Sequence, residues 1–164
     1  MGKIRLGSHV KDIINGRTGT AYERVIWLFG CDHIVVLPDM GADKKEIEYG
    51  LIMGIPYDEQ RLEELDDTKE ELILTETRGK QDSFFGKEAE DKVTGFKGII
   101  VGRKVALFGV DQYAIQPKVG KKGSVKKAKW FDEGRLNILG KGVEVEEVTA
   151  EKPGGCEYIP TVYV

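Results

Sequence analysis

The chain has 164 residues, of which 40% are hydrophobic and 32% are charged, and its formal net charge is −3. This composition is typical of a globular protein, and the small negative net charge excludes a general electrostatic attraction to nucleic acid or membranes. The length suits one ordinary domain or two small ones.

One stretch of the sequence occurs twice. Residues 7–38 align with residues 86–117 without a gap, at a constant offset of 79, and ten of the 32 aligned positions are identical. The repetition predicts two modules of about 60 residues, a size at which folding buries only roughly 60% of the unfolded surface, so we expect them to pack together or in an oligomer. The identical pairs are Gly7/Gly86, Asp12/Asp91, Gly16/Gly95, Gly19/Gly98, Arg24/Arg103, Leu28/Leu107, Phe29/Phe108, Gly30/Gly109, Asp32/Asp111 and Pro38/Pro117.

Three β-prone runs make up each copy. In the first copy, residues 10–14 precede Asn15-Gly16, a dipeptide that predicts a type I′ hairpin turn with positive φ at both central residues. Residues 20–29 form a long second run, and residues 33–37 form a third that Pro38 ends. Three antiparallel strands with tight turns predict a strongly curved meander. The same runs recur at residues 92–93, 99–108 and 112–116.

The duplication continues beyond the proline at a different offset. Residues 57–62 match residues 131–136 at an offset of 74, so the second copy is shorter by five residues (79 − 74) in the connecting loop, where a change of length costs little. The shared pattern aromatic-Asp-Glu-x-Arg-Leu predicts a short helical turn and a last strand. We expect Tyr57/Phe131 and Leu62/Leu136 to face the core.

The connecting segments differ between the copies. Residues 41–54 mix acidic and apolar side chains and suggest a short helix at residues 44–49, whereas the corresponding loop, residues 118–129, holds six lysines. Residues 66–77 suit either a strand or a helix. We favour a strand at residues 71–75, because residues 143–148, which follow the second copy, alternate apolar and acidic side chains and predict a strand there.

Candidate catalytic and metal-binding groups are few. His9 and His33 are not spaced like metal ligands and do not recur in the second copy. No nucleophile elbow, phosphate-binding loop or dinucleotide fingerprint is present. We therefore expect a protein that is not an enzyme and needs neither cofactor nor metal. Cys31 and Cys156 are interpreted as thiols in a reducing compartment, and a disulfide between them stays open.

Two duplicated aspartates, Asp12/Asp91 and Asp32/Asp111, lie beside turns. Paired carboxylates can serve acid–base chemistry. Aspartate also commonly accepts hydrogen bonds from the backbone amides of turns, and we favour this structural role.

Arg24/Arg103 is a duplicated charge inside the long second strand. The first interpretation is an internal ion pair, either with Asp12/Asp91 or with the Asp-Glu of the closing segment. The second is a pair of guanidinium groups presented to an anionic ligand or partner, because arginine binds phosphate in a bidentate manner.

Aromatic and basic residues supply the other candidate binding groups. Trp27 and Trp130 have no aromatic counterpart in the other copy, and we assign them to the core, with stacking on a base or an interface as the alternative. The lysine-rich loop is either simply solvated or contacts phosphates or an acidic protein surface. Its lysines are Lys118, Lys121, Lys122, Lys126, Lys127 and Lys129.

Residues 93–104, 107–118 and 130–136 together resemble a group of small bacteriophage-encoded proteins of unassigned role, in which one such unit fills nearly the whole chain. The resemblance covers residues 85–139 closely and residues 6–65 less closely. It implies a phage origin and a fold, without a catalytic motif. The opening Val-x-Asp and Gly-x-x-Gly pattern also resembles KOW-type small barrels, which often bind RNA or protein.

The expected fold is mainly β, with two tandem small β-barrels of the Src-homology or KOW type, short helical turns and a β-rich C-terminal tail. The first barrel module is expected over residues 1–84 and the second over residues 85–164. The tail, residues 158–164, is either an edge strand of its own barrel or a strand donated to a neighbouring subunit.

The leading functional hypothesis is a non-catalytic, oligomeric phage protein in the host cytoplasm that sequesters or occludes a host factor or an anionic small molecule. One alternative is a virion accessory protein that decorates a head or tail and contacts capsid or tail proteins. The other is a KOW-type nucleic-acid-binding protein, against which the net charge of −3 counts. No membrane partner is expected. The candidate binding residues are Arg24, Arg103, Trp27, Lys121, Lys122, Lys126 and Lys127.

Overall fold

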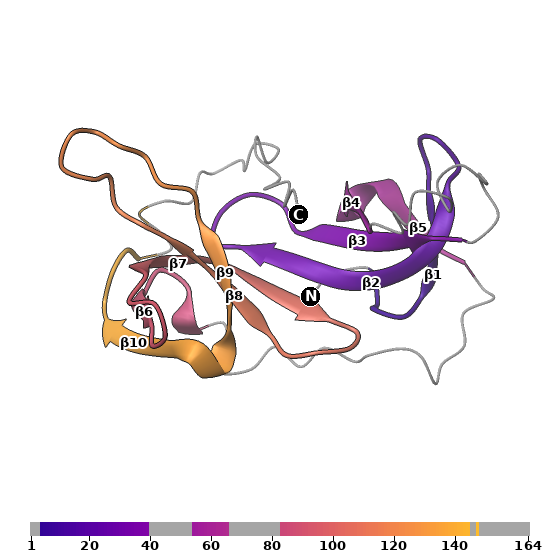
Figure 1. The fold of residues 1–164 in the computed structure, drawn as a ribbon. Helices are drawn as coiled ribbons and strands as arrows, with labels where there is room; N and C mark the ends of the chain where they lie inside the picture. Colours follow the sequence, from indigo (N-terminus) through magenta and orange to yellow (C-terminus); the bar gives the residue numbers. More distant parts are fainter. Residues whose placement is uncertain (1–3, 40–53, 66–82, 145–146, 148–164) are drawn as a thin grey trace, which may run out of the picture. The chain divides into compact units, whose positions relative to one another are not determined.

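The computed structural model describes residues 4–39, 54–65, 83–144 and 147 (Figure 1). Within these residues the chain is mainly β, built from antiparallel strands and short 3-10 helices. No helix in this part of the chain is long and apolar enough to cross a membrane. The helix predicted at residues 44–49, the strand predicted at residues 71–75, the C-terminal tail and Cys156 lie outside the described residues.

The described residues divide into two compact units. The first contains residues 4–25, 32–39 and 54–65, and the second contains residues 26–31 and 83–144 together with residue 147. Residues 26–31 join the second unit although they precede the expected module boundary between residues 84 and 85. One contact that holds them there is the hydrogen bond from the Leu28 amide to the Val101 carbonyl, at 2.8 Å.

The first unit has five strands and one 3-10 helix. β2 pairs with both β1 and β3, β3 pairs with β4, and β1 pairs with β5, so the strand order is β4-β3-β2-β1-β5 (Figure 1). The elements are β1 (His9–Asp12), β2 (Thr18–Trp27, whose last two residues belong to the second unit), β3 (His33–Pro38), β4 (Ile55–Asp58), η1 (Glu59–Arg61) and β5 (Leu62–Glu64).

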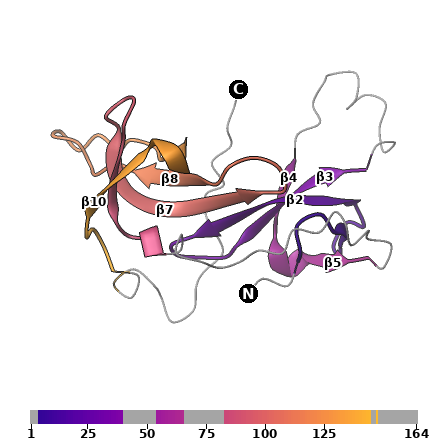
Figure 2. The same cartoon turned by 90° about the horizontal axis from the view of Figure 1, so that it is seen from below.

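The second unit repeats this architecture element by element. Its strand order is β9-β8-β7-β6-β10, again with a 3-10 helix before the last strand (Figure 1; Figure 2 labels β7, β8 and β10 in a second view). Even the irregularity of the long strand recurs, at Ala21/Glu23 in β2 and at Ile100/Gly102 in β7. The elements are β6 (Glu88–Asp91), β7 (Lys97–Ala106), β8 (Gln112–Gln116), β9 (Lys129–Asp132), η4 (Glu133–Arg135) and β10 (Leu136–Gly140).

The strand pairings do not close either sheet. In each unit the two outermost strands of the order, β4 and β5 or β9 and β10, are consecutive in the chain and are joined by a three-residue 3-10 helix rather than by a ladder. The structure therefore shows an open antiparallel sheet in each unit. The strand expected at residues 143–148 does not begin as predicted, because Val143 and Glu144 lie outside any strand.

The two hydrophobic cores are built from equivalent positions. Tyr57 and Leu62 lie in the first core and Phe131 and Leu136 in the second, which confirms the predicted inward orientation of these side chains. The exchange of Ala21 for Ile100 enlarges the second core, while Ile4 is an additional member of the first. The equivalent core pairs are Val10/Ala89, Ala21/Ile100, Ile34/Tyr113, Val36/Ile115, Tyr57/Phe131 and Leu62/Leu136.

The predicted type I′ turn at Asn15-Gly16 is wrong. Gly16 has a φ of +78°, but Asn15 does not have a positive φ. The loop between β1 and β2 is longer than two residues and is closed by hydrogen bonds from the Gly16 amide to the Asp12 carbonyl and from the Asp12 amide to the Arg17 carbonyl, both at 2.8 Å. The second unit closes its loop in the same way, so only the glycine is required, and Thr94 can replace the asparagine.

Candidate functional site

The duplicated aspartates of the first turn are structural. Asp12 and Asp91 are almost completely buried, with 1% and 0% of their surface exposed. Asp12 accepts a hydrogen bond from the Ile14 amide at 3.1 Å, and Asp91 accepts one from the Thr94 amide at 2.9 Å, which confirms the predicted bonds to turn amides. Each also binds an arginine of the 3-10 helix, with an Arg61–Asp12 distance of 2.6 Å and an Arg135–Asp91 distance of 2.7 Å.

These contacts keep both carboxylates ionised. Hydrogen bonds from Arg135 lower the pKa of Asp91 far below its usual 3.8, although burial opposes the change. Burial alone would raise the pKa of Asp12, but hydrogen bonds from the Ile14 amide and from Arg61 outweigh it and lower that pKa as well. Both groups are thus fully engaged, and neither is placed to exchange protons with a substrate near neutral pH.

The duplicated arginines also point inward. Arg24 is only 2% exposed and donates to Glu59 at 2.9 Å and to the Ile4 carbonyl at 2.5 Å. Its second carboxylate partner is Asp32, at 3.4 Å. The predicted ion pair with the Asp-Glu of the closing segment is therefore confirmed for Arg24, whereas the predicted pair with Asp12 is wrong because Arg61 binds that carboxylate.

Arg103 has the same orientation in the second unit. It is 6% exposed, and its Nε and Nη2 donate to Asp111 at 2.9 and 2.5 Å. Asp32 and Asp111 thus serve as arginine partners. The structure favours internal ion pairs over guanidinium groups presented to an anionic ligand, because both arginines are buried against carboxylates.

The histidines make local contacts within the first unit. His9 lies 2.8 Å from Asp39, and the buried His33 lies 3.2 Å from Asp58. Over the described ranges, no group of three or more His, Cys, Asp or Glu side chains is arranged to hold a metal ion.

The two tryptophans lie together in the second unit. The ring centroids of Trp27 and Trp130 are 5.7 Å apart, with planes inclined by 57°. Both side chains are half-buried, and neither belongs to the core cluster beneath the sheet. The Nζ of Lys104 lies 5.2 Å from the centre of the Trp130 ring. The assignment to the core is therefore wrong for this pair, which forms a separate aromatic cluster on the other face of the sheet.

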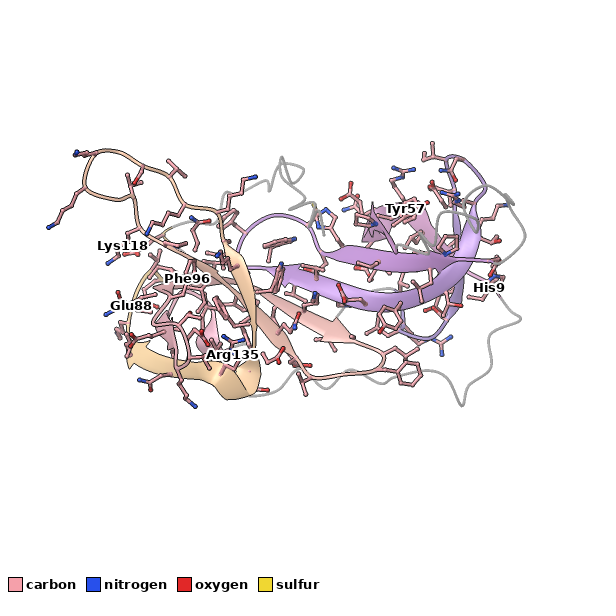
Figure 3. The ribbon with its side chains drawn as sticks, in the orientation of Figure 1. His9, Tyr57, Glu88, Phe96, Lys118 and Arg135 are labelled. Atoms are coloured by element: carbon pink, nitrogen blue, oxygen red, sulfur yellow. The ribbon has the colours of Figure 1, made fainter. Side chains whose placement is uncertain are left out.

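The lysine-rich loop connects β8 to β9 and extends away from these strands (Figure 1). Lys118 stands where the loop leaves β8 (Figure 3). The loop is ordered by a hydrogen bond from the Gly120 amide to the Ser124 carbonyl at 2.9 Å, and by one from the Gln116 side chain to the Lys126 carbonyl at 2.8 Å. All six lysines of residues 118–129 are exposed to solvent.

The two units carry opposite charge. Residues 83–144 contain 13 Lys and Arg against 7 Asp and Glu, an excess of six positive charges. Residues 4–39 and 54–65 contain 5 Lys and Arg against 8 Asp and Glu, an excess of three negative charges. The net charge of the whole chain therefore conceals a basic second unit, and this weakens the argument against an anionic partner.

One duplicated pair of exposed aromatic residues was given no role in the sequence analysis. Phe29 and Phe108 are identical in the two copies, yet 52% and 69% of their surfaces are exposed. Most of the other identical pairs have a structural role, such as the arginine–aspartate pairs and the glycines with positive φ. Their identity in the two copies was the feature of the sequence that could have drawn attention to Phe29 and Phe108.

The structure thus brings Trp27 and Trp130 together at the strand that follows the lysine-rich loop, whereas Arg24 and Arg103 are buried and paired with carboxylates. Comparisons with family models, with curated proteins and with solved structures found no match to this chain.

Proposed function

We propose that the protein is a non-catalytic binding protein whose second unit binds an anionic partner through the lysine-rich loop. The observation that carries this proposal is the concentration of five exposed lysines on one ordered loop, with a sixth, Lys129, at the start of β9, in a segment (residues 83–144) that has an excess of six positive charges. Such a surface attracts anions at long range, and its lysine ammonium groups bind phosphate or carboxylate oxygens at contact.

The partner is an anionic host factor or an anionic small molecule. Arg24 and Arg103 support the scaffold in this proposal, since their guanidinium groups are already neutralised by Asp32, Glu59 and Asp111. The binding residues are Lys121, Lys122, Lys126 and Lys127, with Trp27 and Trp130 near the base of the loop. A phage origin and assembly into an oligomer that sequesters its partner remain part of the proposal, motivated by the resemblance to small phage proteins.

The proposal for the fold is a pair of small Src-homology-type barrels. In each unit the strand order and the 3-10 helix before the last strand are those expected of such a barrel, and the cores occupy equivalent positions. Two repeated scaffolds then differ mainly in their loops, which is where binding groups concentrate in proteins.

Retention on an immobilised polyanion tests the proposal. The variant K121Q/K122Q/K126Q/K127Q removes four charges from the loop, and the control K11Q/K92Q/K97Q/K141Q removes four exposed lysine charges elsewhere. We expect the wild type and the control to be retained at low salt and the loop variant to elute much earlier. Equal loss of retention in both variants, or no retention of the wild type, contradicts the proposal.

A further inference from the structure

The tryptophan pair packs against two small residues, Gly102 and Ala114, which we call the seat. Gly102 of β7, Ala114 of β8 and Trp130 of β9 are aligned in register across the sheet. A Cβ atom at Gly102 would lie 2.9 Å from Cε3 of Trp27 and 3.3 Å from Cη2 of Trp130, so both rings lie directly on the backbone at this position.

This seat exists in the second unit alone. The equivalent row in the first unit consists of Glu23, Val35 and Pro56, which are also aligned across β2, β3 and β4. That row offers neither a small residue at the centre of the long strand nor an aromatic ring. The aromatic surface therefore distinguishes the same unit that carries the lysine-rich loop.

The lysine-rich loop joins the sheet beside the seat. Lys129 is the first residue of β9 and is paired with the core residue Ile115, and its Nζ lies 5.4 Å from the centre of the Phe96 ring, so its side chain is on the face opposite Trp130. Gln116, which alternates with Tyr113 and Ile115 and so faces away from the core, ties the loop to the sheet through the Lys126 carbonyl, at 2.8 Å. Lys104 adds a cation above the indole of Trp130, at 5.2 Å.

The chemistry of this surface identifies the class of partner. Lysines spread over a 12-residue loop suit an extended polyanion better than a single small anion. Partly exposed indole rings next to lysines suit planar bases whose phosphates are close by, because bases stack on aromatic side chains while the backbone follows a basic groove. A duplex hides the faces of its bases, whereas a single strand exposes them.

We infer that the anionic partner is a single-stranded nucleic acid, whose bases stack on the Trp27–Trp130 pair and whose phosphates contact the lysine-rich loop. This inference rests on the proposed function and specifies its partner. Polar groups on the same face, Gln112 and Asp132, which are joined by a hydrogen bond of 2.7 Å, border the seat and contact the edges of a stacked base.

Intrinsic fluorescence reports on this site directly, because Trp27 and Trp130 are the only two tryptophans of the chain. The full-length protein is titrated with oligothymidylate, with oligouridylate, with the corresponding duplex and with inorganic polyphosphate. We expect a single strand of DNA or RNA to quench the fluorescence and to bind at least about tenfold more tightly than polyphosphate or the duplex.

The variant Trp130→Leu keeps an apolar cover over Gly102 but removes the stacking surface. It is expected to bind the single strand about tenfold more weakly or worse and to bind polyphosphate unchanged. Phe108→Leu, which removes an exposed aromatic ring elsewhere in the same unit, is the matched control and should retain full affinity. Thermal unfolding of both variants verifies that they are folded. The quenching of wild-type fluorescence tests the inference even if a variant does not fold.

The outcomes separate the two proposals. If polyphosphate and single strands bind equally, with dependence on the loop lysines and without quenching, the inference is overturned and the proposed function stands. Tighter binding of the duplex also overturns the inference. If no polyanion binds, both proposals are overturned. Quenching by the single strand together with the loss of affinity in Trp130→Leu supports both.

Discussion

Arg135 of η4 binds the buried Asp91, the last residue of β6, through two hydrogen bonds, from Nε at 2.8 Å and from Nη2 at 2.7 Å. Arg61 and Asp12 form the equivalent pair in the first unit. Each pair fastens the 3-10 helix near the end of a unit to the first turn of that unit, and each arginine also covers an aromatic core residue, Phe131 or Tyr57. This ion pair, present in both units, explains why the segment Asp-Glu-x-Arg-Leu occurs in both copies.

The ion pair between Arg135 and Asp91 makes the stability of the folded protein sensitive to acid. Because the pKa of Asp91 is lowered in the folded state, its contribution to the free energy of unfolding is complete above the unfolded-state pKa of about 3.9 and is lost as the pH falls through the lower folded-state pKa. We expect Asp91→Asn to be less stable than the wild type at pH 7 and to show a flatter dependence of stability on pH below about 4.

Urea unfolding between pH 2 and pH 7 measures this difference. Glu63→Gln, which removes an exposed carboxylate, is the control and should follow the wild-type profile. Parallel profiles for Asp91→Asn and the wild type would show that the carboxylate is not held by Arg135.

The second core contains an isoleucine where the first has an alanine. Ile100 is fully buried, so Ile100→Ala should lower the free energy of unfolding by about 2–5 kcal/mol. Ile14→Ala, at a side chain that is 72% exposed, should change it by less than about 0.5 kcal/mol. Denaturant unfolding checks both values, and similar losses for the two variants would contradict the assigned core.

Neighbouring residues of the first turn should respond differently to substitution. Gly16 has a φ of +78° with no atom near its Cβ position, so Gly16→Ala should cost about 1 kcal/mol through backbone strain alone. Asn15→Thr recreates the residue found at the same point of the second unit and should cost less than about 0.5 kcal/mol. A larger loss of unfolding free energy for Asn15→Thr than for Gly16→Ala would contradict the longer loop and support the type I′ turn predicted from the sequence.

The seat of the tryptophans admits no side chain. Gly102→Val should displace the rings, shift the tryptophan emission towards that of solvent-exposed indole and lower the thermal midpoint, since a Cβ atom there would clash with Trp27. Gly134→Ala is the matched control because a Cβ atom at Gly134 meets nothing within 4 Å. Unchanged emission in Gly102→Val would place the indoles elsewhere.

Much of the fold could be predicted from the internal repeat. The offsets of 79 and 74 align every strand and 3-10 helix of one unit with its counterpart, because the spacing of core residues and turn glycines was kept in both copies. The turn at Asn15 could not be predicted from the dipeptide, since Asn-Gly suits several turns and the carbonyl of Asp12 selects the longer loop. The expected barrel closure depends on strand pairing beyond the reach of local patterns.

The candidate site was only partly predictable. The lysines of the loop were visible as a cluster in the sequence, whereas the contact between Trp27 and Trp130 joins residues from different copies and has no local signature. The available signal was the exchange of Glu23 for Gly102, which removes a side chain where the rings lie. The ion-pair partner of Arg24 was ambiguous in the sequence, because three duplicated carboxylates, Asp12, Asp32 and Glu59, were candidates for it.

The salt dependence of polyanion binding tests the central claim most directly. The affinity of the wild type for a single-stranded oligonucleotide or polyphosphate is measured across salt concentrations and compared with that of K121Q/K122Q/K126Q/K127Q. We predict a steep fall for the wild type and, for an oligonucleotide, a slope of log K against log salt that is smaller by up to about 3 in the variant, since each lost phosphate contact contributes about 0.7. Equal slopes for the two proteins, or no binding at low salt, would contradict the assignment of the lysine-rich loop as the binding site.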